Sequence, residues 1–197
     1  MANVKGYEMS SLNPGWIKKK VPASYSNDEL KRIVLFFVIN TPCIDLSSSA
    51  IPVQNYGWGN DVWKKGKLRE QLLSVAGLKT NHTFFSAKKL EDLKEVCKKA
   101  NLAKGFHKDR ELERIAMYKP SRYNDFLAVC YHIRNALAHG RLAMYPISNS
   151  TDIVFVLEDG VKKGTDFQVR SRMILKRSTL LKWIDIIEAG KIGEQSK

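Results

Sequence analysis

The sequence predicts a mainly α protein, a bundle of about five to six helices with a small β-hairpin or three-stranded insertion before the last helix. Two observations carry this prediction. Apolar residues recur at three- and four-residue spacing in several segments before Gly140, which is typical of helices that bury one face. After Gly140 the pattern changes to runs of β-branched and apolar residues separated by turn residues.

Length and charge bound the class of protein. A chain of 197 residues suits one core, so we expect residues 1–197 to form a single domain. Lys and Arg number 33 against 20 Asp and Glu, a formal charge of +13, which favours a polyanionic partner such as RNA. The alternatives are an acidic membrane surface and a charge that only aids solubility.

The cysteines and the apolar runs indicate a cytoplasmic protein. Cys43, Cys97 and Cys130 lack a Cys-x-x-Cys pairing, so the sequence predicts neither a disulfide framework nor a metal site. The longest apolar run, 33–39, is far shorter than the about 20 residues of a membrane-spanning helix. The N-terminus lacks the pattern of a signal peptide.

The predicted helices follow a basic arm, residues 1–24, that we expect to be irregular. Ser26 and Glu29 match a capping box at the first helix. The segment 41–59 is rich in Ser, Pro and Gly, and we expect a loop that covers a site or mediates contacts. The further helices are predicted from Asn60 to Ala76, Ser86 to Ala100, Asp109 to Tyr118, Ser121 to His139 and Ser178 to Ala189, with Gly190 as the stop.

The β insertion is predicted over residues 141–176. Strands are expected at 153–157 and 167–175, with Asp159, Gly160 and Gly164 between them as the turn residues of a hairpin. Residues 142–147 are expected to add a third strand. The sequence therefore places all predicted strands between two helices.

One helix carries an unusual polar face near its end. His132, Asn135 and His139 are three and four residues apart, so they fall on one line, and Arg134 flanks it. Gly140 follows, where a left-handed cap is expected. A protonatable imidazole beside a permanent cation is suited to phosphate chemistry.

The segment from Arg134 and Asn135 to His139, at the end of a helix, resembles the signature of the HEPN superfamily. The resemblance covers residues 86–190. It implies a HEPN-like helical bundle and a metal-independent endoribonuclease of the toxin or anti-phage defence type, without a cofactor. It also implies RNA as substrate, a homodimer, and in toxin members an antitoxin or regulatory partner.

The resemblance assigns catalysis to Arg134 and His139, with Asn135 in support. Metal-free RNA cleavage uses the 2′-hydroxyl as nucleophile, so catalysis must move protons and stabilise a charged phosphorane. Imidazole suits the first task and guanidinium the second. One chain supplies one such histidine, and a two-fold dimer would supply the second.

Further residues are candidates for substrate binding. His132 extends the polar line, although packing explains it as well, and Arg141 is expected to bind phosphate or to cap the helix carbonyls. Lys64 and Lys65 lie among aromatic residues, a mixture that single-stranded RNA grooves use. Core packing explains those aromatics, Tyr56, Trp58 and Trp63, equally well.

A different function class remains open from the sequence. The chain would then be a non-catalytic HEPN module for RNA binding, protein interaction or dimerisation, such as an antitoxin or a sensor subunit. In that case Arg134 and His139 would only stabilise an interface. Cleavage of RNA distinguishes the two classes.

Overall fold

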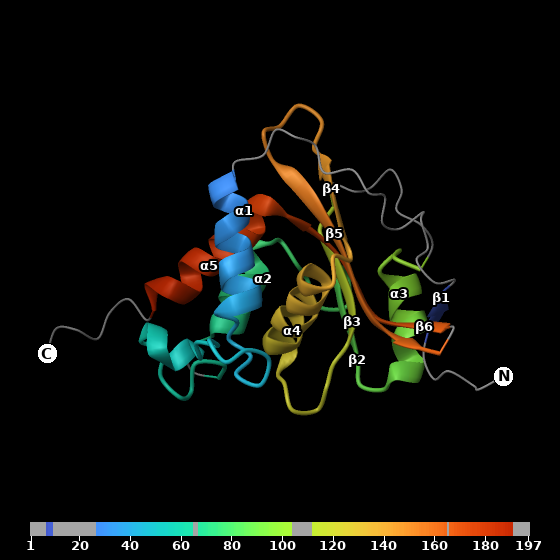
Figure 1. Cartoon of the computed structure of the whole chain (residues 1–197), viewed down its shortest axis with the longest axis horizontal. Coiled ribbons are helices and arrows are strands. Elements are labelled where there is room, and N and C mark those ends of the chain that lie inside the picture. The colour runs from blue at the N-terminus through green and yellow to red at the C-terminus, as the bar shows by residue number, and fades with distance from the viewer. Residues whose placement is uncertain (1–6, 10–26, 65–66, 104–111, 165, 191–197) are drawn as a thin grey trace, which may run out of the picture.

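The protein is an α/β fold, with a mixed β-sheet covered by helices on both faces (Figure 1). The structure, a computed structural model, describes residues 7–9, 27–64, 67–103, 112–164 and 166–190. The predicted mainly α, HEPN-like bundle is therefore wrong. The strands that the sequence places in a small insertion are the centre of a six-stranded sheet.

The sheet is built around the hairpin of β5 and β6. Its strands are β1 (Tyr7–Met9), β2 (Phe84–Ala87), β3 (Arg114–Tyr118), β4 (Leu142–Pro146), β5 (Ile153–Lys163) and β6 (Asp166–Lys176). The order is β2-β3-β6-β5-β4, and β1 also pairs with β6. Strands β2 and β3 are parallel, and the other pairs are antiparallel. The parallel pair is joined through a helix, as a βαβ unit requires.

Helices of unequal number cover the two faces of this sheet. They are α1 (Asn27–Val34), α2 (Leu68–Val75), α3 (Leu93–Lys99), α4 (Asp125–Ala138) and α5 (Arg177–Ala189), with a π-helical turn η1 (Leu35–Ile39) and 3₁₀ turns η2 (Val53–Tyr56) and η3 (Leu90–Asp92). Successive residues of β5 alternate between the two cores: Phe155 and Leu157 face α4 and α5, whereas Val154 and Val156 face α3. Strand β5 is thus buried on both sides.

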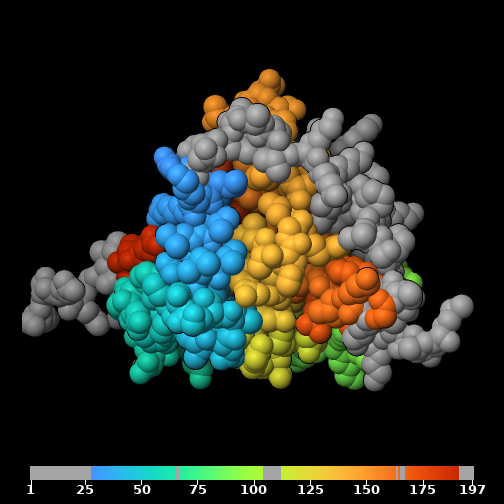
Figure 2. All heavy atoms as spheres, viewed as in Figure 1, coloured from blue at the N-terminus to red at the C-terminus, as the bar shows by residue number. Residues whose placement is uncertain are grey.

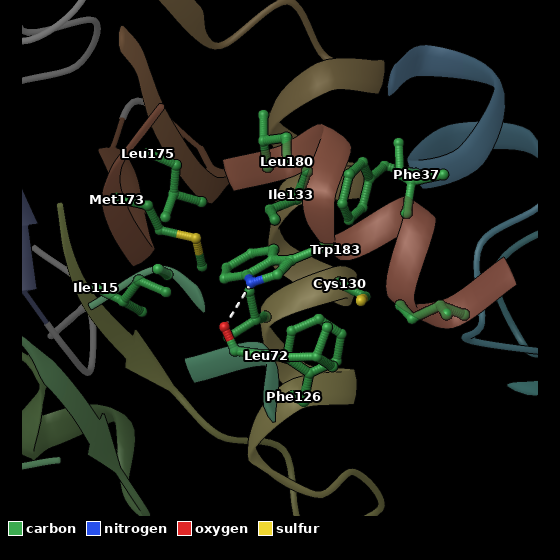
Figure 3. Close-up of a cluster of buried hydrophobic side chains, with 14 of the residues drawn as sticks. Phe37, Leu72, Ile115, Phe126, Cys130, Ile133, Met173, Leu175, Leu180 and Trp183 are labelled. Atoms are coloured by element: carbon green, nitrogen blue, oxygen red, sulfur yellow. Dashed lines mark hydrogen bonds between the residues drawn. The ribbon is translucent and has the colours of Figure 1, made fainter. Parts of the chain in front are cut away.

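The larger core surrounds Trp183 of α5 (Figure 3). This side chain is fully buried, its Nε1 donates to the Leu72 carbonyl at 2.7 Å, and its ring meets Phe126 edge to face at 5.2 Å. These contacts join α5, α2 and α4 above the sheet. Helix α4 is consequently a rigid support for the residues at its end.

Two strands replace segments that the sequence predicts to be helical. Residues 114–118 form β3 within the segment predicted as a helix over 109–118, of which 109–111 lie outside the described residues. Ser86 lies in β2, and the helix expected from there begins only at Leu93. Short apolar runs do not distinguish a buried strand from a buried helix, because burial on both faces removes the alternation.

Two other helices begin later than the sequence predicts. Helix α4 begins at Asp125 and not at Ser121, because Asn124 caps it by accepting the Leu127 N–H at 2.9 Å. Helix α2 begins at Leu68 and not at Asn60. The last helix is confirmed, and Gly190 ends it with a φ of +67°. The predicted irregular arm lies outside the described residues except for β1.

The segment 41–59 is anchored to the core and includes η2. Thr41 and Cys43 are buried, and the Trp58 Nε1 donates to the Ile187 carbonyl at 2.9 Å. Among the helices described, none has both the length and the apolar character needed to cross a membrane.

Candidate functional site

Helix α4 ends in a glycine cap. Gly140 has a φ of +63°, and its N–H donates to the Leu137 carbonyl at 3.1 Å. The Arg141 N–H donates to the Ala136 carbonyl at 2.8 Å, which completes a Schellman motif. The predicted left-handed cap is confirmed. The chain then joins the sheet at once, since β4 begins at Leu142.

His139 is the cap residue, and its imidazole is exposed to solvent. It makes no side-chain hydrogen bond or ion pair within the described part of the chain. Its backbone N–H donates to the Asn135 carbonyl at 3.0 Å, so the main chain is fixed while the ring is free. A ring in this situation is accessible to an incoming phosphate.

Arg134 is half-buried and held on two sides. Its Nη1 donates to the Asn135 Oδ1 at 3.2 Å, and its Nη2 donates to the Leu46 carbonyl at 3.2 Å. Its Nε is buried and has no hydrogen-bond partner. The guanidinium is thus oriented before any ligand arrives, and the loop after η1 contributes to that orientation.

Asn135 lies between Arg134 and His139 in the sequence. Residues five apart point about 140° apart around a helix, whereas residues four apart differ by about 40°. Asn135 and the Leu46 carbonyl hold the Arg134 guanidinium in place. The structure therefore brings these three predicted catalytic residues to one end of one helix.

His132 lies on the same line but is buried beneath the helix, with a side chain that is 0% exposed. Its Nδ1 lies 2.6 Å from Asp159 Oδ2, and its Nε2 lies 2.6 Å from the Tyr118 carbonyl. Both ring nitrogens are used, and neither faces solvent. In this structure His132 joins α4 to β5 and β3 and does not reach a substrate, which matches the packing alternative.

Arg141, just before β4, takes part in a buried ladder of charges with β5 and β6. It pairs with the Glu158 carboxylate, whose Oε2 also accepts from the Arg172 Nε at 3.0 Å. The Arg141 guanidinium lies 3.8 Å from the centre of the Phe167 ring. Its side chain is 13% exposed, so its principal contacts are internal rather than with solvent or with the helix carbonyls.

The charge ladder and the site under α4 use adjacent residues of β5. Glu158 faces the α3 side, and Asp159 faces α4. A β-bulge follows them, because the pairing of β5 and β6 shifts register between Asp159 and Gly160. A Cβ on Gly160 would lie 2.5 Å from the Phe167 ring and 2.6 Å from the Gln168 carbonyl, so this position requires glycine. The turn predicted at Asp159 and Gly160 is wrong, because β5 continues to Lys163, whereas the turn predicted at Gly164 is confirmed, with a φ of +61°.

The aromatic residues that could have lined an RNA groove beside the lysines pack into the core instead. Trp58 is buried, Trp63 stacks on Phe126 at 6.1 Å, and Tyr56 packs against the core. Lys64 is exposed, and Lys65 lies outside the described residues. The aromatic rings are therefore core residues, as the alternative interpretation held.

Metal binding and thiol chemistry are two further possibilities for the described residues. Within the described ranges, no three His, Cys, Asp or Glu side chains are grouped so that they could hold a metal ion. Burial raises the pKa of Cys43 to about 12 and of Cys97 to about 12, and it raises the pKa of Cys130 well above its ordinary value. All three thiols are free and buried, which disfavours thiolate chemistry.

Sequence reasoning missed Asp159, Glu158 and Arg172. The available signal was two adjacent acidic residues inside a run of β-branched residues, where a polar turn was inferred instead. Adjacent acids in a buried strand need partners on both faces of the sheet.

Comparisons of the chain with protein-family models, with curated proteins and with solved structures find no match.

Proposed function

We propose that this protein cleaves RNA without a metal ion, by attack of the 2′-hydroxyl on the neighbouring phosphate. The observation that carries the proposal is the pair at the end of α4. His139 presents a free, exposed imidazole, and Arg134, five residues earlier at the same helix end, presents a guanidinium held by Asn135 and the Leu46 carbonyl. The proposal uses these side chains and not the helical bundle that the resemblance implied.

The chemistry assigns one task to each group. His139 accepts or donates the proton at the 2′-oxygen or the leaving 5′-oxygen. Arg134 stabilises the extra negative charge of the phosphorane, because a guanidinium stays ionised and offers several donors. Asn135 orients Arg134. The surplus of basic residues, 33 against 20, supplies attraction to the RNA backbone that falls with salt.

A second copy of the chain completes the proposed mechanism. Efficient cleavage uses two proton-transfer groups on opposite sides of the phosphate, and each chain brings one exposed His139 at this helix end. A two-fold pair places the same patch on both sides of one cleft. A monomer at micromolar concentration that still cleaves RNA contradicts this part of the proposal.

The test is cleavage of a mixed RNA pool by the purified protein in EDTA. His139→Ala and Arg134→Ala should each reduce the rate by about 10²- to 10⁴-fold, the range expected for a proton-transfer group. His82→Ala is the matched control, because His82 is also exposed but lies in the turn before β2. Undiminished cleavage by His139→Ala refutes the mechanism.

A second candidate function is that of a protein-interaction module. It is favoured by an exposed apolar strip on α1 and the turn that follows it, which lies on the surface in Figure 2. Val34, Leu35 and Ile39 are 40%, 52% and 43% exposed, and they line an open groove of about 690 Å³. This candidate predicts that Leu35→Asp abolishes a partner contact and that no RNA is cleaved.

A further inference from the structure

We infer that Asp159 is the positioning residue of this site: through Asn135 it fixes the Arg134 guanidinium, and through His132 it locks α4 to the sheet. The inference deepens the proposed function: a catalytic role for this positioning rests on RNA cleavage by Arg134 and His139. The contacts themselves are independent of any RNA chemistry. They form one chain of hydrogen bonds from β3 to the loop after η1.

The hydrogen-bond chain begins at the Tyr118 carbonyl. A carbonyl only accepts, so the His132 Nε2, at 2.6 Å, must carry a hydrogen. The His132 Nδ1 lies 2.6 Å from Asp159 Oδ2, and this contact also needs a proton between the two atoms. The pair thus shares one proton and is neutral as a whole, which is the form that complete burial tolerates.

The next link fixes the orientation of an amide. Arg134 can only donate, so the Asn135 oxygen must face the Arg134 Nη1. The Asn135 nitrogen then faces Asp159 Oδ2 at 3.3 Å, where it finds an acceptor. Every donor in this series of hydrogen bonds has an acceptor only because residue 159 is a carboxylate. Asp159 therefore determines the orientation of Asn135 and, through it, of Arg134.

The regular alternation of β5 supplies this carboxylate. Leu157 and Asp159 face the α4 side, whereas Val156 and Glu158 face the α3 side. The pairing with β6 shifts register only after Asp159. Asp159 is 2% exposed, so it acts through its neighbours and touches no substrate.

The substitution Asp159→Asn has a specific consequence. A neutral His132 keeps its hydrogen on Nε2 and donates it to the Tyr118 carbonyl. Its Nδ1 is then an acceptor, so the amide nitrogen of Asn at position 159 must donate to it. That nitrogen then also faces the Asn135 nitrogen, and two donors meet. If Asn135 turns its amide to relieve the clash, its nitrogen faces Arg134, which only donates. Keeping His132 charged instead leaves an uncompensated buried cation.

A reciprocal exchange restores the chain. In the double variant Asp159→Asn with Asn135→Asp, the new carboxylate accepts from Arg134 and from the new amide, and the amide donates to His132. The amino-acid composition is unchanged, and His132 is neutral in the exchange. The single variant Asn135→Asp instead places two carboxylates against each other, and the new one still accepts from Arg134. Asp159→Asn should therefore release Arg134, and the double variant should hold it again.

The experiment measures rotation of the Arg134 guanidinium by nitrogen NMR in the purified protein without RNA. Rotation should speed up about tenfold or more in Asp159→Asn, which corresponds to about 1.4 kcal/mol, and return toward the original rate in the exchange. Glu158→Gln is the matched control, since it alters the adjacent carboxylate on the opposite face. It should leave Arg134 unchanged.

The outcomes separate the inference from the proposed function. Unchanged rotation in Asp159→Asn, or no recovery in the exchange, overturns the role of Asp159 even if the protein cleaves RNA. If Asp159→Asn does not fold, the exchange decides alone: rotation as slow as in the original protein supports the role of Asp159, and faster rotation overturns it. Recovery of slow rotation together with absence of RNA cleavage leaves the positioning role standing and refutes the proposed function.

Discussion

Replacing Glu158 by alanine tests whether the charge ladder holds the sheet together. Its carboxylate, on β5, lies between the guanidinium of Arg141, just before β4, and that of Arg172 on β6. Arg172 is 0% exposed. The substitution leaves two cations facing one another across the gap, and it also removes packing volume beneath α3.

The expected loss is large because the charges are out of water. Breaking a buried ion pair by removing one partner costs about 3–5 kcal/mol. For a chain of this length each kcal/mol lowers the melting temperature by about 2–4 °C, so the shift is on the order of 10 °C. Arg141→Ala leaves a neutral pair of Glu158 and Arg172 and should cost only about 2 kcal/mol, one hydrogen bond to a charged group.

Urea unfolding followed by circular dichroism measures both variants, with RNA affinity measured on the folded proteins. We expect Glu158→Ala to be the less stable of the two and Arg141→Ala to bind RNA as the original protein does. Equal stability of Arg141→Ala and the original protein, together with weaker RNA binding, would refute the ladder and return Arg141 to the substrate site.

Two further predictions concern buried polar groups. Burial raises the pKa of Glu113, so the folded protein favours its protonated form and loses stability as pH rises above the ordinary value of 4.5. Glu113→Gln, which can still bond Lys176 N and Thr179, should therefore gain stability over the original protein between about pH 4 and pH 7; a constant difference in urea midpoint contradicts this. The buried Tyr123 hydroxyl has no hydrogen-bond partner among the described residues, and burial raises the pKa of Tyr123 to about 12. Tyr123→Phe should stabilise by up to about 1 kcal/mol at neutral pH and by more above pH 10, where the unfolded tyrosine ionises first; a lower melting temperature would show that the hydroxyl is bonded.

Helix α4 and its glycine cap were predictable because their signals are local. Apolar spacing and the Gly140 position fix the helix end, and with it the exposed place of His139. The last helix and its stop at Gly190 follow from the same kind of pattern. Each of these features depends on neighbours within one or two turns of chain.

Strands β2 and β3 were not predictable in this way. Most of their residues are buried, so alternation is absent. Strand β3 depends on pairing with β6, far along the chain, and β2 in turn pairs with β3. The mainly α prediction failed at this point. It treated the strands after Gly140 as an appendage, whereas they supply the partner that turns two apolar runs into strands.

The sequence by itself determined that Arg134, Asn135 and His139 lie at one helix end, because helix periodicity is a property of adjacent residues. Only the tertiary structure decided that His132 is buried beneath that helix and that Arg141 pairs with Glu158 of the sheet. The reason is that a polar side chain is buried or free according to its partners. Those partners, Asp159 and Glu158, come from a strand whose register no local pattern specifies.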